Sequence, residues 1–68
     1  MILRQMRSTY FRPVDIVVVN EYQDIMLPVN GIHSFSSLAK AKSYFGKKDV
    51  LEVVNDEATR TTRIYLQG

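Results

Sequence analysis

One helical segment in this chain is accompanied by four strand-like segments, and this ratio constrains the fold most strongly. Residues 34–46, SFSSLAKAKSYFG, carry apolar side chains at helical spacing. The strand-like runs are IVVV at 16–19, IMLPV at 25–29, VLEVV at 50–54 and IYL at 64–66. A sheet with apolar residues on both faces and a single helix keeps one face that the helix does not cover.

The strand segments predict two hairpins. Four consecutive β-branched residues suit a strand and crowd a helix, so we predict a first strand over 14–20. A second strand is expected over 24–29, where Pro28 belongs at a sheet edge or a strand end. The segments 50–55 and 61–67 predict the second hairpin. The predicted order is ββαββ, a small α+β domain with a mostly antiparallel four-stranded sheet and the helix packed on one face.

The expected helix has recognisable ends. Ser34 or Ser36 is suited to be its N-cap, because a serine oxygen accepts from an unpaired backbone N–H. Gly46 stands where a left-handed residue often ends a helix, and Asn30-Gly31 is expected to end the strand before it. The inward stripe is predicted to be Phe35, Leu38, Ala41 and Phe45.

Length and composition limit the ways in which this fold is stabilised. The chain has 68 residues and no cysteine, and His33 is its only histidine. A disulfide, a thiolate metal site and a two-histidine metal site are therefore excluded within one chain, and we expect no metal or cofactor. Small domains often need such a staple, and binding to a partner or to a second copy is the one that remains.

The chain is expected to divide into a basic N-terminal arm, residues 1–12, and a single domain, residues 13–68. The arm contains three arginines and no acid, and its first eight residues are expected to be loose. No segment has the roughly 20 apolar residues of a membrane span. Arg4, Gln5 and Arg7 interrupt any signal-peptide core, so a cytoplasmic location is the default expectation.

The helix-free side of the sheet is the predicted protein interface. The first and third strands have apolar residues on both faces, whereas a strand with one wet face normally alternates. A contiguous apolar patch on that side is typical of an interface with another protein or a second copy. Its predicted members are Val17, Val19, Met26, Val50, Val54 and Tyr65. The alternative is that the arm folds back over this side through Ile2, Leu3, Tyr10 and Phe11.

Two basic clusters offer a different function. One is the arm with Tyr10 and Phe11, and the other is a group of four lysines, Lys42 included, around the helix C-terminus. Arginines beside aromatic rings hold phosphates and stack bases. If both clusters lie on one surface, nucleic-acid binding becomes credible. The predicted contacts are Arg4, Arg7, Arg12, Lys40, Lys47 and Lys48.

Catalytic signatures are missing from the sequence. His33 has no nucleophile or orienting group at a recognisable spacing. The Asp56-Glu57 pair lies in a predicted turn, where neighbouring carboxylates are usually solvated. The three glycines are isolated and form no phosphate-binding loop. We therefore predict a non-enzymatic protein.

Residues 36–67 combine a short Ala- and Lys-containing helix that ends in aromatic-Gly with a Val-rich hairpin, VLEVVNDEATRTTRIYLQ. This half of the chain resembles the back half of small bacteriophage accessory proteins. The resemblance implies a protein without enzymatic activity that binds a host factor and inhibits or redirects it. The apolar residues on both faces of the sheet add the expectation of a homodimer. The resemblance also implies the host cytoplasm as the location. It transfers no functional residue.

Overall fold

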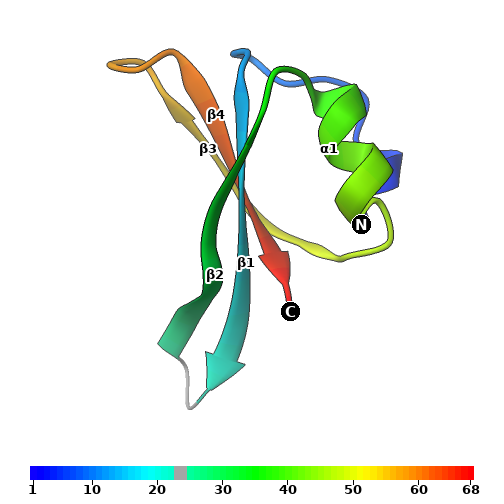
Figure 1. The fold of residues 1–68 in the computed structure, drawn as a ribbon, viewed down its shortest axis with the longest axis vertical. Coiled ribbons are helices and arrows are strands. Elements are labelled where there is room, and N and C mark those ends of the chain that lie inside the picture. The colour runs from blue at the N-terminus through cyan, green and yellow to red at the C-terminus, as the bar shows by residue number, and fades with distance from the viewer. Residues whose placement is uncertain (23–24) are drawn as a thin grey trace.

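The computed structural model describes residues 1–22 and 25–68, and for residues 21–30 the description is limited to the backbone. It contains one short 3-10 helix, one α-helix and four strands (Figure 1). In chain order these are η1 (Leu3–Gln5), β1 (Val14–Tyr22), β2 (Ile25–Phe35), α1 (Leu38–Phe45), β3 (Val50–Asp56) and β4 (Thr61–Gln67).

The four strands form one mixed sheet in the order β2-β1-β4-β3. Each hairpin is antiparallel, and the first and last strands pair in parallel at the centre, with Val14 opposite Thr62 and Val18 opposite Leu66. The connection through α1 carries the chain from one edge strand, β2, to the other edge strand, β3. The prediction of a small ββαββ domain of the α+β class is confirmed.

Strand β2 is longer than expected. Asn30 and Gly31 do not end it but form a bulge within it, because Val17 lies opposite Ile32 whereas Val18 lies opposite Val29. Gly31 has a φ of 75°, a conformation that glycine adopts at little cost. The predicted turn at 20–23 lies partly outside the described residues, and β1 continues to Tyr22.

Helix α1 is shorter than expected. Its N-cap is Ser37 rather than Ser34 or Ser36, and the Ser37 hydroxyl oxygen accepts from the Lys40 backbone N–H at 3.4 Å. Phe35 therefore belongs to β2. Gly46 has a φ of −56°, so the expectation of a left-handed residue there is wrong. Close approach requires this glycine instead, because an added Cβ would lie 2.6 Å from the Lys42 carbonyl oxygen.

The N-terminal arm packs against the body of the protein, contrary to the expectation that it is loose. The Leu3 side chain is fully buried in the core. The Leu3 N–H donates to the Lys48 carbonyl at 2.9 Å, and the Val50 N–H donates to the Met1 carbonyl at 2.8 Å. These bonds fix the start of the arm beside the segment that leads into β3.

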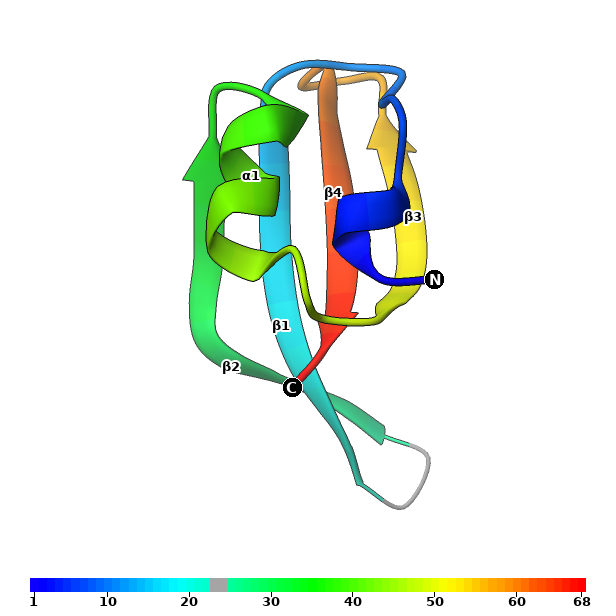
Figure 2. The same ribbon diagram turned by 90° about the vertical axis from the view of Figure 1, so that its right-hand side faces the viewer.

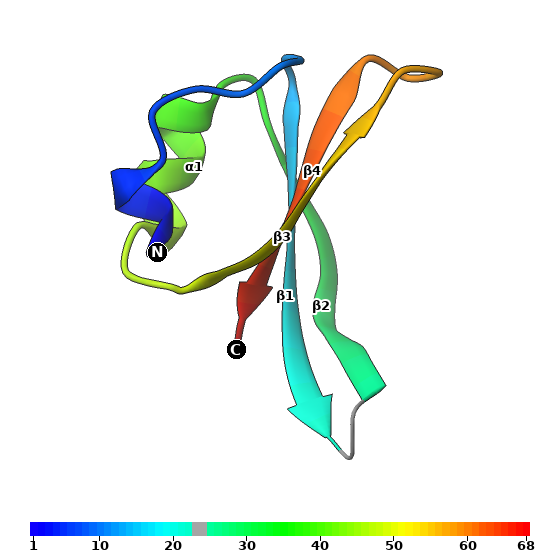
Figure 3. The same ribbon diagram turned by 180° about the vertical axis from the view of Figure 1, so that it is seen from behind.

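The arm and α1 share one side of the sheet, called here the helix side. Figure 2 shows α1 in front of β1 and β2, and η1 in front of β4 and β3. The arm therefore folds back as the alternative expectation proposed, but over the helix side. The opposite side, called here the open side, is not covered by any described element (Figures 1 and 3). The core on the helix side is formed by Leu3, Val14, Ile16, Val18, Leu38, Ala41, Ile64 and Leu66.

Candidate nucleic-acid interface

Two of the predicted protein-interface residues are buried on the open side. Val17 and Val19 are only 4% and 1% exposed, although no helix lies over them. Val17 has Tyr65 on one side and Ile32 on the other in the strand register. The expectation that an uncovered sheet exposes this valine pair is therefore wrong, because neighbouring side chains on the same face shield the central strand.

Val50 lies on the other side of the sheet from the predicted position. The β3–β4 register shifts between Val50 and Glu52, so Val50 lies opposite Leu66 and packs against the core. A bulge at Leu51 adds one residue to β3, and an extra residue reverses the face of every side chain on one side of it. The Met26 side chain lies outside the described residues.

Two of the predicted interface residues, Val54 and Tyr65, lie on the open side and have solvent-accessible surface. The rest of that side is mixed in polarity. Asp15 accepts a hydrogen bond of 2.8 Å from the Ser34 hydroxyl, and Arg63 lies beside Asp15 in the register. The open side is therefore less apolar than the sequence pattern predicts.

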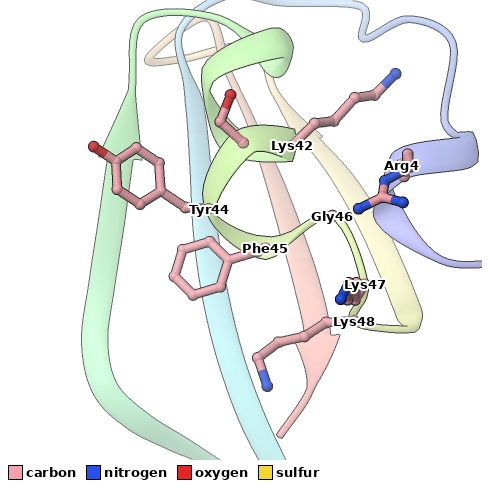
Figure 4. A pocket seen from close by; sticks show the side chains of 8 residues that line it. Arg4, Lys42, Tyr44, Phe45, Gly46, Lys47 and Lys48 are labelled. Carbon is pink, nitrogen blue, oxygen red and sulfur yellow. The ribbon is translucent and has the colours of Figure 1, made fainter.

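The basic residues, by contrast, come together on the helix side. The Arg4 N–H donates to the Gly46 carbonyl at 2.9 Å, which holds η1 against the end of α1. A hollow of about 390 Å³ lies there, and Figure 4 shows the side chains around it. Its lining consists of Arg4, Lys42, Ser43, Tyr44, Phe45, Gly46, Lys47 and Lys48.

A second hollow, of about 370 Å³, lies between the arm and the start of α1. It is lined by Arg7, Ser8, Thr9, Arg12, Ser37, Leu38, Ala39 and Lys42. Lys42 lines both hollows and so connects the arm cluster with the helix cluster. This residue was not among the predicted contacts, because its position near the inward stripe suggested a stem that covers apolar surface.

The combined surface is called here the basic layer, and its cations are Arg4, Arg7, Arg12, Lys40, Lys42, Lys47 and Lys48. Five of the six predicted nucleic-acid contacts line the two hollows, and Lys40 is exposed on α1. No carboxylate among the described residues lines either hollow.

Charge is strongly separated along the chain. Residues 1–12 and 36–48 contain seven cations and no acid. The other residues contain two arginines and all seven acids, which is a net charge of −5. The overall charge of +2 therefore conceals a layer of +7. Such a concentration of one sign creates a surface potential that attracts polyanions.

Two exposed tyrosines accompany these cations. Tyr44 and Tyr10 are each 76% exposed. The Tyr44 ring lies 5.4 Å from that of Phe35, and the Tyr10 ring lies 4.6 Å from that of Phe11. Tyr44 was not identified from the sequence, although an aromatic residue between lysines near a helix end was the available signal.

His33 lies in β2 rather than in a loop, and its ring packs 5.2 Å from the Phe45 ring. No three metal-ligating side chains come together in the part of the chain that the structure describes. Within residues 1–22 and 25–68, neither helix has the length and apolar character needed to cross a membrane.

Comparisons with protein-family models, with curated proteins and with solved structures gave no match. The likeness to bacteriophage accessory proteins therefore stays a prediction.

Proposed function

We propose that this protein is a non-enzymatic nucleic-acid-binding module whose basic layer holds the phosphate backbone. The observation that carries the proposal is the convergence of the arm cations and the helix cations around two adjoining hollows. A basic surface of this kind is the electrostatic footprint of nucleic-acid binding, and phosphate contacts supply most of the sequence-independent affinity. A cytoplasmic location is part of the proposal.

This function is preferred over protein binding through the open side because most of the predicted basic contacts lie on one surface, whereas half of the predicted apolar contacts do not. Nucleic-acid binding was predicted only if the two basic clusters lie on one surface. Lys42 lines both hollows and so lies between the arm cluster and the helix cluster. Three residues of the predicted apolar interface are not exposed on the open side. Val17 and Val19 are buried, and Val50 packs against the core on the helix side.

The experiment is a salt titration of binding, followed by fluorescence anisotropy with a labelled oligonucleotide from about 25 to 200 mM NaCl. The test variant is Lys47→Gln, and the matched control is Arg60→Gln. Both residues are exposed and both substitutions remove one positive charge, but Arg60 lies outside the basic layer, in the turn between β3 and β4.

We expect Lys47→Gln to weaken binding and to reduce the slope of log K against log[salt] by about 0.7, the value for one phosphate of a single strand. Arg60→Gln should leave the slope unchanged. The proposal fails if the wild-type protein binds no oligonucleotide at 25 mM NaCl, or if the two variants weaken binding equally, since that result reports net charge alone.

A second candidate function is contact with another protein through β3. This strand is an edge of the sheet, and its apolar residues Leu51, Val53 and Val54 are 38–39% exposed. Among the described residues, Met1 and Ile2 pair only with Val50, the first residue of β3, and with Asp49 just before it. An exposed apolar edge pairs readily with another strand, and a second copy of the chain offers the same edge.

Light scattering at high micromolar concentration tests this candidate. If copies pair through β3, the wild-type protein is a dimer and Val54→Lys shifts it to a monomer, since charge on an edge strand blocks pairing. A control substitution, Ile32→Lys, places the same charge at an exposed residue of β2. A monomeric wild-type protein, or equal effects of both lysines, removes this candidate.

A further inference from the structure

The geometry points to unpaired bases as the ligand of the basic layer, with Tyr44 and Tyr10 as the rings on which they stack. This inference rests on the proposed function, and it narrows the ligand from nucleic acid in general to single-stranded DNA or RNA.

Tyr44 combines exposure with support. Its ring is 76% exposed, yet it lies against Phe35 at an interplanar angle of 37°. Phe35 in turn contacts Phe45 at 6.0 Å, and both phenylalanines pack against the core. One side of the Tyr44 ring is thus backed by the protein while most of its surface is open to solvent.

The position of Tyr44 connects it with the phosphate contacts. It is among the residues that line the first hollow, and Figure 4 shows its ring on the β2 side of α1, pointing away from Arg4. Proteins that bind single strands combine a cationic groove for the backbone with aromatic rings for the bases. Lys40 precedes Tyr44 by one turn on the same face of α1, so it is placed to contact the phosphate of a base that stacks on Tyr44.

Tyr10 belongs to the arm segment next to the second hollow, although its side chain is not part of the lining. Its ring meets Phe11 edge to face, at 81°. The Phe11 N–H donates to the hydroxyl oxygen of the buried Thr62 at 3.0 Å, which anchors the segment to β4. Tyr10 lies in sequence between Thr9 and Arg12, which line that hollow. Each of the two basic clusters therefore includes one exposed tyrosine beside a phenylalanine ring.

Rings in this position select unpaired bases. In a duplex the base faces are covered by their neighbours, whereas the bases of a single strand are free to stack on protein rings. Stacking tolerates any sequence, because every base has a π-face. We therefore expect a preference for single strands with little sequence discrimination.

The experiment compares three labelled probes in fluorescence anisotropy at low salt: oligo-dT of about 12 nucleotides, an abasic strand of the same length, and a duplex. The protein variants are Tyr44→Ala and Tyr44→Phe. The phenylalanine variant keeps the ring and loses only the hydroxyl group, so it is the matched control.

We expect the wild-type protein to bind oligo-dT at least about fivefold more tightly than the abasic strand, since stacking contributes that much or more per base. Tyr44→Ala should weaken oligo-dT binding by about tenfold and leave abasic binding unchanged. Tyr44→Phe should bind like the wild type. Circular dichroism confirms the fold of each variant.

The outcomes separate this inference from the proposed function. Equal binding of oligo-dT and the abasic strand by the wild type, with a salt slope that Lys47→Gln still reduces, overturns the inference and leaves the function standing. Absence of binding to all three probes overturns the function itself. If Tyr44→Ala does not fold, the wild-type comparison of oligo-dT with the abasic strand decides alone.

Discussion

The backbone N–H of Arg4 donates to the backbone carbonyl of Gly46 over 2.9 Å. This bond joins the N-terminal segment to the end of α1, two parts of the chain that are far apart in sequence. Because it is made by backbone atoms, it fixes the place of Arg4 relative to Lys47 and Lys48 without help from their side chains. The basic layer is thus built into the fold.

The burial of Leu3 predicts that the arm is needed for stability. Leu3→Ala should lower the free energy of unfolding by about 2–5 kcal/mol, because it removes a buried side chain and leaves a cavity in the core. Ile32→Ala is the matched control, since it also removes three carbons but from an exposed residue, and it should cost at most about 1 kcal/mol. Urea denaturation measures both. Equal effects would mean that the arm is not part of the core.

The contact at Gly46 predicts that even one added methyl group disturbs the basic layer. In Gly46→Ala the new Cβ would meet the Lys42 carbonyl oxygen and lie 3.4 Å from Arg4 Nε. Relief requires movement of backbone or of η1, so we expect a loss of about 1–3 kcal/mol in urea denaturation. The Arg4 amide signal in an NMR spectrum should shift as well. Wild-type stability together with an unmoved Arg4 amide would contradict this account.

The buried hydroxyl of Thr62 makes two hydrogen bonds. It accepts from the Phe11 N–H at 3.0 Å and donates to Asn55 Oδ1 at 2.9 Å. Thr62→Val keeps the shape but leaves that N–H without its acceptor, so we expect a loss of about 1–3 kcal/mol in stability. Thr61→Val is the control, because the Thr61 hydroxyl makes only an exposed bond to the Thr59 carbonyl. Thermal unfolding of the pair should separate them clearly, and indistinguishable melting temperatures would show that the buried bonds contribute nothing.

The secondary structure was predictable where its causes are local. The β-branched run of β1 and the apolar spacing of α1 each depend on neighbours within a few residues, and β4 was predicted with its correct bounds. The prediction that Asn30-Gly31 ends β2 was wrong because the cause of the conformation there is not local. The pair is typical of a turn, but continued pairing of β2 with β1 decides that it is a bulge.

The sidedness of β3 was not predictable from alternation alone. Val50 and Val54 share a face in a regular strand, and only the extra residue at Leu51 separates them. Val17 illustrates a related limit, because its burial depends on side chains from neighbouring strands, Tyr65 among them.

The cations of the candidate site were predictable one by one, whereas their convergence was not. It depends on which side of the sheet receives the arm, and that is decided by the burial of Leu3 in the core that also contains Leu38 and Ala41. The alternative expectation from the sequence was that the arm, Leu3 included, covers the open side. Nothing in the local pattern of residues 1–12 distinguishes the two sides.

The parallel pairing of β1 with β4 at the centre of the sheet has a consequence for how the chain folds. Each hairpin closes locally, but the contact between them pairs residues that are distant in sequence, such as Val14 and Thr62, 48 positions apart. The entropy of closing that loop is lost before the central contacts compensate for it. We therefore expect a high contact order and a folding time of milliseconds to seconds, with neither hairpin persisting until the last strand has docked.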